Sequence, residues 1–233
     1  MQGNSKKKED YANQMQVIYE NHEKWLNGRL KGIGGSDASA VAGYNPYKSN
    51  IDLWEEKTGL KAPEDISNKS YVKYGHDAEP LLVKLFALDY PQYEVNYNDN
   101  YRVNYNDEHN FIFCTRDCDL VEKVTGIKGA LEIKTTELLN SMQKEKWNDQ
   151  IPTNYYCQVL QYFITDKELQ FVWVKAQIKS DFGDGKLVLK TKHYYFTREQ
   201  CQDDIEWLKN QEIEFWNKYV LKGVRPNRLL PNI

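Results

Sequence analysis

The chain has 233 residues, of which 40% are hydrophobic and 28% charged, so it can bury a core of its own, and a disordered or collagen-like chain is excluded. The mean hydropathy is −0.78 and no apolar run approaches the roughly 18 residues that span a bilayer. The first residues lack the apolar middle of a signal peptide, so we expect a cytoplasmic protein without membrane contact.

The net charge and the cysteines restrict the partners and cofactors. A formal charge of −3 argues against binding through a bulk basic surface, but permits a local basic groove around an acidic metal site. None of the four cysteines has CxxC spacing, which predicts reduced thiols and disfavours both a disulfide framework and an iron–sulfur cluster. Most of the many aromatic residues are expected to pack in the core, and a few are candidates for base stacking.

Four helices are predicted before the first strand, and three of them precede residue 60. The polar residues 1–31 have a loose helical spacing of apolar positions, which predicts a helical N-terminal arm. A glycine turn then leads into an alanine-rich helix that Ser36 and Asp37 can cap, and Asp37 is interpreted as a cap rather than a metal ligand. Residues 49–58 predict a short helix that ends at Gly59.

The next helix carries the first candidate acid. It is expected to begin near Tyr74, because Pro80 is tolerated only in the first turn of a helix. That start places Glu79 in the first turn, where an acid also favours the helix dipole.

The remaining segments predict a central mixed β-sheet flanked by helices, an α/β or α+β fold in one domain over residues 1–233. This domain has the arm at 1–31, a core at 32–196 and a C-terminal helix and tail at 197–233. The expected elements are strands at 93–103, 111–121 and 129–135, a helix at 153–164, a hairpin of 169–178 with 186–196, and an amphipathic helix at 197–221.

The most informative segment is the strand that contains Glu132 and Lys134. Side chains at i and i+2 share one face of a strand, so this acid and this ammonium project together, while Leu131 and Ile133 point into the core. An exposed ion pair on a sheet surface is the alternative for any isolated ExK sequence.

Two further acids, Asp117 and Asp119, end the preceding strand and can approach Glu132 if the two strands are antiparallel. Two carboxylates and a lysine at a sheet end suit Mg²⁺ or Mn²⁺, with a backbone carbonyl of Leu131 or Ile133 as a further ligand. Such a site supports phosphodiester hydrolysis. Asp119 is preferred as the first carboxylate because two hydrophobic residues follow it, and Asp117 is expected on the same face as an alternative.

The D…ExK pattern resembles the PD-(D/E)xK nuclease superfamily, whose core is the restriction-endonuclease fold. Five motifs in order narrow the resemblance to the YqaJ-type viral recombinase and lambda exonuclease family over about residues 25–165. These motifs are GIGGSDA at 32–38, Gly75 with Glu79-Pro80, Asp119, Glu132-Ile133-Lys134, and YYCQVLQY at 155–162.

The resemblance implies a role for each matching residue. Asp119, Glu132 and Lys134 correspond to the metal-binding and catalytic core, and Glu79 to a carboxylate that supports a second metal or orients water. Gln158 and Tyr162 correspond to the Q-x3-Y motif, with Gln158 at the active site and Tyr162 near the DNA. Gln161 is the less favoured glutamine.

The resemblance also implies a pocket for the terminal phosphate of the 5′ end. Arg29, seven residues before Ser36, offers a guanidinium fork, and Ser36 lies beside the backbone N–H groups of Gly34 and Gly35 at a helix N-terminus. Arg29 can equally be an ordinary surface arginine.

The function implied by the resemblance is a Mg²⁺-dependent 5′→3′ exonuclease of phage or prophage origin that resects double-stranded DNA ends. Its implied partners are a single-strand annealing protein and further copies of itself in a homotrimeric ring. A PD-(D/E)xK endonuclease and a non-catalytic DNA-binding module are the alternatives. The latter predicts salt-sensitive binding without cleavage.

Overall fold

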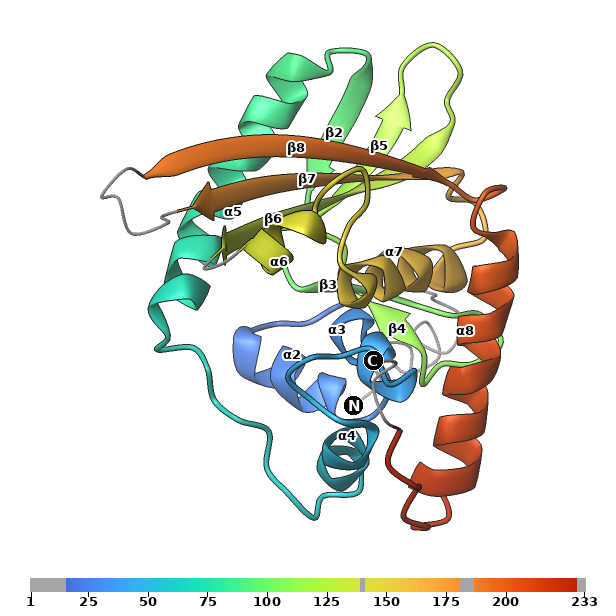
Figure 1. Cartoon of the computed structure of the whole chain (residues 1–233). Helices are drawn as coiled ribbons and strands as arrows, with labels where there is room; N and C mark the ends of the chain where they lie inside the picture. The colour runs from blue at the N-terminus through green and yellow to red at the C-terminus, as the bar shows by residue number, and fades with distance from the viewer. Residues whose placement is uncertain (1–15, 139–140, 181–186, 230–233) are drawn as a thin grey trace, which may run out of the picture.

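The computed structural model describes residues 16–138, 141–180 and 187–229. Its centre is a five-stranded mixed sheet in the order β2-β5-β6-β7-β8 (Figure 1). β6 and β7 are parallel, and the other neighbours are antiparallel. The strands are β2 (Tyr93–Tyr97), β5 (Cys118–Glu122), β6 (Lys128–Leu138), β7 (Phe171–Ser180) and β8 (Val188–Thr197).

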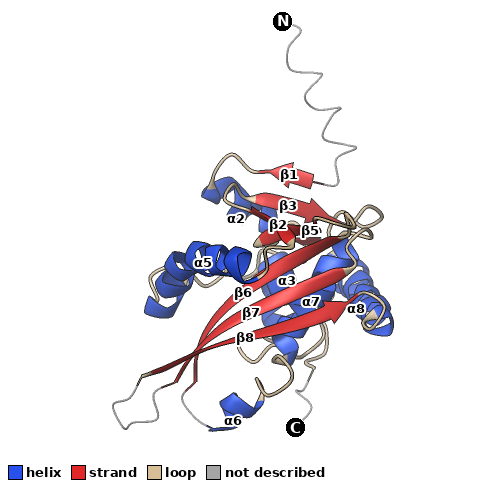
Figure 2. Cartoon of the chain, turned by 90° about the horizontal axis from the view of Figure 1, so that it is seen from above, coloured by secondary structure: helices blue, strands red, loops and turns tan. Residues whose placement is uncertain are grey.

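A second, three-stranded sheet packs beside the first and has the order β1-β3-β4. Its antiparallel strands are β1 (Gln16–Ile18), β3 (Arg102–Tyr105) and β4 (Phe113–Cys114). Figure 2 shows β1 and β3 at one end of the molecule, beyond the β2 edge of the large sheet.

Helices lie on both faces of the large sheet (Figures 1 and 2). α5 (Ser70–Asp89) covers one face, while α7 (Thr153–Thr165), backed by α3 (Gly35–Val41) and α8 (Gln202–Glu214), covers the other. A π-helical segment, Phe215–Val220, continues α8. The remaining helices are α2 (His22–Arg29), α4 (Asn50–Lys57) and α6 (Ser141–Glu145).

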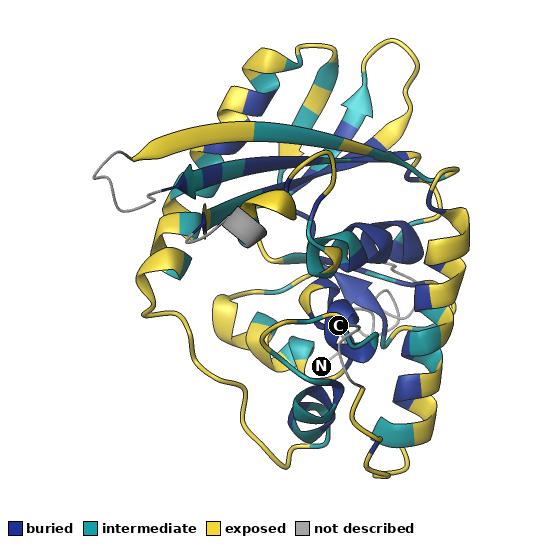
Figure 3. Ribbon diagram, viewed as in Figure 1, coloured by how far each residue is buried: buried dark blue, intermediate teal, exposed yellow. Residues whose placement is uncertain are grey.

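Both faces of β6 are buried, which explains why its sequence is apolar around a few charges. Leu131 and Ile133 pack with α5 in one hydrophobic cluster. Ala130 belongs to the other cluster, under α7, and residues two and four positions later share its side of the strand. Figure 3 shows this burial along β6, β7 and α7, whereas the outer side of α8 is exposed. The expected mixed sheet flanked by helices is confirmed.

The N-terminal arm differs from the expected helix where the structure describes it. Gln16–Ile18 form β1, and the helix α2 begins only at His22. Pairing with β3 decides this, because Gln16 Nε2 donates to Asn104 Oδ1 at 2.8 Å and three residue pairs are in register. The first 15 residues of the arm lie outside the described residues.

The expected start of the Pro80 helix was wrong. α5 begins at Ser70, so Pro80 lies in the middle of a 20-residue helix and Glu79 is not in its first turn. Burial of Leu82, Val83 and Phe86 against the sheet stabilises the helix despite the hydrogen bond that proline cannot donate. An interaction of Glu79 with the helix dipole is therefore excluded.

The first two expected strands are each split between the two sheets. Residues 93–103 contain β2 and the start of β3, and residues 111–121 contain β4 and most of β5. Asn98 fixes the first crossing, since its side chain accepts from Arg102 N and donates to the carbonyls of Arg102 and Arg116. The helices at 35–41, 50–57 and 153–165 and the late hairpin agree with the prediction, although residues 181–186 of its turn lie outside the described residues.

Among the described segments, no helix is both long and apolar enough to cross a bilayer.

Candidate active site

Glu132 and Lys134 form a buried ion pair on the α7 face of β6. Glu132 is only 2% exposed, so the alternative of a solvated pair on a sheet surface does not apply. Lys134 Nζ also donates to Gln158 Oε1 of α7 at 2.9 Å and lies 5.0 Å from the ring centroid of Tyr155. The structure therefore brings the expected acid, lysine and glutamine into one cluster.

The preference for Asp119 beside Glu132 was wrong, because the structure places Asp117 there. Asp119 pairs with Arg102 at 2.7 Å and Arg116 at 2.8 Å, away from Glu132. Asp117 Oδ2 instead accepts a 2.7 Å hydrogen bond from the backbone N–H of Ile133, between Glu132 and Lys134. The two acids do not lie on one strand, since β5 begins at Cys118 and Asp117 precedes it.

Glu79 approaches the same cluster from α5. Its Oε1 accepts a 3.0 Å hydrogen bond from the hydroxyl of Tyr97 on β2. Burial raises the pKa of Glu79, and the charge of Glu132 adds to this effect, while the Tyr97 hydrogen bond opposes it. The Glu79 carboxylate is therefore close enough to Glu132 for the two charges to interact, although it comes from the helix on the other face of the sheet.

The cluster concentrates negative charge where little water is present. Burial, followed by the charges of Glu132 and Glu79, raises the pKa of Asp117 well above its ordinary value. Burial lowers the pKa of Lys134, but Glu132 and Asp117 outweigh burial, so the pKa of this lysine lies above its ordinary value. Lys134 is consequently an ammonium group at neutral pH. It forms an ion pair with Glu132, and its charge also acts on Glu79 and Asp117.

Tyr162 supports Glu132 from behind and was wrongly expected to face DNA. It is fully buried, and its hydroxyl donates to Glu132 Oε2 and lies 3.3 Å from the Thr115 carbonyl. Burial raises the pKa of Tyr162 well above its ordinary value, so the hydroxyl remains a donor. Gln161 is also buried and donates to the carbonyls of Ile33 and Phe113, which agrees with its lower ranking.

The residues expected to bind a terminal phosphate lie at the start of α3. Arg29 Nη2 donates to Ser36 Oγ at 2.6 Å, and the guanidinium carbon of Arg29 lies 4.8 Å from the ring centroid of Trp25. Gly35 is buried beneath Gln158, where an added Cβ would lie 3.2 Å from Gln158 Cγ. Ser36 follows Gly35 directly in the chain, so the start of α3 packs against Gln158, while phosphate binding by Arg29, Ser36 and Gly35 stays a prediction.

Asp37 has the capping role that its position indicates. Its Oδ2 accepts from Gly34 N at 3.2 Å and from Lys57 Nζ at 2.8 Å. Burial raises the pKa of Asp37, but the charges of Lys57 and Arg29 outweigh it and lower the pKa overall. This acid is neutralised within the fold.

The donor set suits a hard divalent cation in its chemistry. Asp117 and Glu132 supply carboxylate oxygens. The N–H group of Ile133 donates to Asp117, and the carbonyl of Ile133 points to the same edge of β6 as this N–H group. Within the described ranges, no three His, Cys, Asp or Glu side chains converge as a ready-made metal centre. The oxygens of Glu132 are engaged by Lys134 and Tyr162, so a cation would take a ligand position that Lys134 now holds.

Sequence reasoning missed Tyr97 and Tyr155, which contact Glu79 and Lys134. Tyr97 ends a strand with alternating exposure and carried no signal of its own. Tyr155 lies three residues before Gln158, about one helical turn, so the helical period that placed Gln158 at the site could have indicated Tyr155 as well. All four cysteines are free and buried, in agreement with the expected reduced thiols.

Comparison with known sequences matches residues 24–168 to the YqaJ-like viral recombinase domain. The chain is also 32% identical over 205 residues to the uncharacterized protein YqaJ of Bacillus subtilis strain 168. The alignment covers 88% of this chain and 58% of that relative, so the chain spans less than two thirds of the relative's length.

Comparison with solved structures shows the fold of alkaline exonucleases. The alkaline exonuclease of Laribacter hongkongensis aligns with a TM-score of 0.62 and 14% identity, over 87% of this chain and 94% of that chain. The same exonuclease in complex with dAMP has a TM-score of 0.53 and 15% identity, over 87% and 97% of the two chains. A phage related exonuclease from Haemophilus somnus 129PT has a TM-score of 0.52 and 13% identity, over 82% and 96%.

The family that the motifs indicate is therefore confirmed by a match to well over half of the chain, and the fold agrees with it. The chain belongs to the YqaJ-like viral recombinase domain family.

Proposed function

We propose that the chain is a Mg²⁺- or Mn²⁺-dependent nuclease that hydrolyses phosphodiester bonds of double-stranded DNA from the 5′ end. One observation carries the proposal: Asp117, Glu132 and Lys134 meet at the edge of β6, with Glu79 and Gln158 beside them. Buried acids that lie together, two of them (Asp117 and Glu79) with a raised pKa, are typical of catalytic centres.

Each side chain has a separate task in this proposal. Asp117, Glu132 and the carbonyl of Ile133 would hold the cation, which when bound supplies Lewis-acid chemistry to the scissile phosphate. Lys134, an ammonium that also donates to Gln158, orients the attacking water or neutralises charge that develops on the phosphate. Glu79 accepts a hydrogen bond from that water, and Tyr162 keeps Glu132 in place.

The direction of digestion is proposed from the Arg29–Ser36 pair. A guanidinium group and a hydroxyl that already contact each other can bind a terminal phosphate through several hydrogen bonds. Gly35, the chain neighbour of Ser36, packs under Gln158, and Gln158 accepts a hydrogen bond from Lys134. A phosphate held there would set the distance between the 5′ end and the bond that is cut.

Family membership supports a role in recombination. We propose that the exonuclease resects linear duplex ends, that the exposed 3′ strand passes to a single-strand annealing protein, and that the chain assembles as a ring-shaped homotrimer in a phage or prophage context. Light scattering on the purified protein tests the ring, since a strict monomer at working concentration contradicts it.

The test of the activity is digestion of a linear 5′-phosphorylated duplex, labelled separately at each end, in Mg²⁺ and in EDTA. We expect mononucleotides to be released from the 5′ ends in Mg²⁺ alone. The Glu132→Ala protein should bind the duplex without cutting it, because the carboxylate that would hold the cation is gone.

Closed-circular plasmid is digested in parallel. Nicking of the plasmid would show an endonuclease on the same residues. Salt-sensitive DNA binding without cleavage at any divalent ion, by protein with an intact melting transition, would contradict the nuclease proposal and favour a binding module.

A further inference from the structure

A buried acid, Glu212, lies where α8 packs against α7. Ile205, Leu208 and Glu212 are spaced by three and four residues, so they share one face of α8, and all three are buried. Ile205 and Leu208 pack in the same hydrophobic cluster as residues of α7, whereas Glu212 brings a carboxyl group to that face and is 0% exposed. A glutamate is rarely buried to this extent unless it is paired, so its partner has to be identified.

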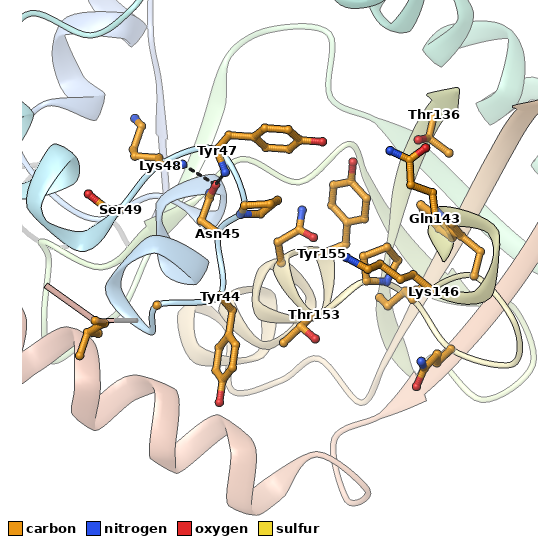
Figure 4. Close-up of a pocket in the computed structure, with 18 of the residues that line it drawn as sticks. Tyr44, Asn45, Tyr47, Lys48, Ser49, Thr136, Gln143, Lys146, Thr153 and Tyr155 are labelled. Atoms are coloured by element: carbon orange, nitrogen blue, oxygen red, sulfur yellow. Dashed lines mark hydrogen bonds between the residues drawn. The ribbon is translucent and has the colours of Figure 1, made fainter. Parts of the chain in front are cut away.

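This acid lies away from the open side of the proposed catalytic centre. A cavity of about 720 Å³ opens on that side, and its lining includes Tyr155, whose ring centre lies 5.0 Å from Lys134 Nζ. Figure 4 shows Tyr47 and Tyr155 extending into the cavity, with Lys146 reaching in from the α6 side. Glu212 is not part of the lining. It can therefore act on the site only through the protein groups that pack against it.

Gln161 of α7 connects Glu212 to the site. Its Nε2 atom donates to the carbonyls of Ile33 and Phe113 at 3.2 Å each. Carbonyl oxygens only accept, so the amide cannot be turned over, and Gln161 Oε1 points away from them. This Oε1 atom is buried, and no described group donates to it. The Gln161 amide is also close enough to Glu212 to act on its pKa through hydrogen bonding.

The hydrogen bonds at this contact are complete only if Glu212 has a proton. Its two carboxyl oxygens and Gln161 Oε1 are three buried acceptors, and none receives a hydrogen bond from the residues that the structure describes. An ionised carboxylate would leave all three without a donor in apolar surroundings, which is costly. A neutral carboxylic acid supplies an O–H donor, so one hydrogen bond to Gln161 Oε1 satisfies both side chains.

The charges around Glu212 agree with a neutral acid. Burial raises its pKa well above the ordinary value; Gln161 opposes this effect, and the charge of Asp37 on α3 adds to it. On α7, burial raises the pKa of the Cys157 thiol to about 12, with the charge of Glu212 adding to the shift, so this thiol is neutral. No cation of the described segments acts on the pKa of Glu212. A carboxylate at this position would thus have no compensating charge.

Gln161 joins two backbone segments that lead into the site. Two glycines separate Ile33 from Ser36, and Phe113 lies four residues before Asp117. Glycine restricts the backbone less than any other residue, so the position of Ser36 depends on the hydrogen bonds at the ends of this glycine turn. Gln161 supplies one of these bonds, at the carbonyl of Ile33.

We propose that Glu212 is a neutral carboxylic acid whose O–H group donates to Gln161 Oε1, and that it is a positioning residue for the terminal-phosphate site. The O–H group fixes the Gln161 amide, and the amide fixes the carbonyl of Ile33. The glycine turn then presents Ser36 to Arg29, whose Nη2 donates to Ser36 Oγ at 2.6 Å. The proposal rests on the proposed function for the identity of the phosphate that binds there.

The protonation state is measured by ¹³C NMR on protein labelled at glutamate. The resonance of Glu212 Cδ is assigned by its loss in Glu212→Gln. We expect the chemical shift of a neutral acid at pH 7, where glutamates of ordinary pKa are ionised. The chemical shift of a carboxylate at this pH would overturn the proposal without any assay of activity.

The positioning role is tested by fluorescence anisotropy in EDTA, where no cleavage is expected, with two labelled duplexes that differ only in a 5′-phosphate or a 5′-hydroxyl group. We expect the wild-type protein to bind the phosphorylated duplex about tenfold more tightly, the factor for one hydrogen bond to a charged group. Glu212→Met leaves Gln161 Oε1 without a donor and should reduce the ratio to roughly threefold or less. Glu212→Gln should retain the ratio, because its amide N–H replaces the O–H donor.

Leu208→Met is the matched control. It introduces the same side chain about one helical turn earlier, on the same buried face of α8, and removes no polar group. This variant should keep the wild-type ratio. Melting curves of the three variants show that each is folded when its affinities are compared.

An unchanged ratio in Glu212→Met, or an equal loss in Glu212→Gln and Glu212→Met, overturns the positioning role. A wild-type protein without a preference for the 5′-phosphate contradicts the terminal-phosphate site of the proposed function, and the positioning role fails with it. A preference that is present in the wild type and survives in Glu212→Met contradicts the positioning role alone, so the two failures are distinguishable.

Discussion

Asp117 and Asp119 are two residues apart and have opposite surroundings. Asp119 lies between the guanidinium groups of Arg102 and Arg116, and Arg116 also binds Asp166 at 2.9 Å. Burial raises the pKa of Asp117, and the charges of Glu132 and Glu79 add to this effect, while Lys134 and the N–H of Ile133 act in the other direction. The charge of Asp119 is thus neutralised by its neighbours, whereas the neighbouring carboxylates of Asp117 oppose its ionisation.

The contrast separates a structural acid from a functional one. The Asp119 network joins β3, β5 and the end of α7, so it stabilises the contact between the two sheets. Burial and the charges of Glu132 and Glu79 oppose the ionisation of Asp117, and a bound cation would favour it. Charge balance, rather than position in the motif, therefore distinguishes the two carboxylates.

The largest expected effect comes from removing the charge of each of these two acids, one at a time. Asp117→Asn should lower the rate of DNA cleavage by roughly a thousandfold, because a proposed cation ligand is lost, and should leave the melting temperature unchanged or higher. Asp119→Asn should instead lower the free energy of unfolding by about 2 kcal/mol, because two arginines lose their partner in a partly exposed network. Nuclease assays and urea unfolding on both variants measure the difference. Equal loss of activity with equal loss of stability would remove the distinction.

Glu79→Gln gives the next largest effect. It keeps an acceptor for the Tyr97 hydroxyl but removes one charge from the cluster, so the cleavage rate should fall about ten- to a hundredfold. The control is Tyr97→Phe, which removes the hydrogen bond and keeps the charge, and should reduce the rate less. A larger loss in Tyr97→Phe than in Glu79→Gln would show that the hydrogen bond, not the charge, matters.

Tyr162→Phe tests how firmly Glu132 must be held. The variant removes a buried donor to a carboxylate and leaves the ring in place, so the cleavage rate should fall about tenfold. The free energy of unfolding should fall by about 1.5–3 kcal/mol, the range for a hydrogen bond to a charged group. Added Mg²⁺ should restore part of the rate, because the loss is in the position of a ligand; a rate that does not respond to Mg²⁺ would argue against this role.

Glu212 offers a third way to accommodate a buried acid, with the smallest effect on activity. It is fully buried in α8, and burial raises its pKa well above the ordinary value, with Gln161 opposing the shift. A folded-state pKa above the unfolded value means that stability is greatest below the unfolded pKa and falls as the pH rises towards the folded pKa. Glu212→Gln should remove this decline, so its melting temperature should exceed that of the wild type at pH 8 and differ less at pH 5. A decline of equal size in both proteins would contradict this assignment.

The sequence was sufficient to predict the chemistry of β6 but not the partner of Glu132. The i, i+2 rule placed Glu132 and Lys134 on one face because β6 runs without interruption from Lys128 to Leu138. The same rule failed for Asp117 and Asp119, since the chain passes between sheets just before Cys118 and no regular period applies there. That crossing depends on hydrogen bonds from Asn98, more than fifteen residues away, which local patterns do not contain.

Helical patterns were predicted well where packing and capping agree, and poorly where packing alone decides. Ser49 caps α4 through Asp52 as its sequence indicates. Pro80 argued for a helix start, yet the buried face that follows it stabilises α5 across the proline. Tyr162 has the spacing of a surface partner of Gln158, and only the packing of α7 on β6 shows that it points inward.

Pro80 also has a consequence for how α5 responds to force and heat. Because Pro80 has no N–H group, the carbonyl of His76 has no helical partner, and α5 lacks one backbone hydrogen bond next to Glu79. The half after the break is anchored in the core by Leu82, Val83 and Phe86, whereas the residues from Ser70 to Glu79 are exposed or half-buried. The helix is therefore divided into a rigid half and a half that can unwind by itself, and Glu79 lies at the boundary between them.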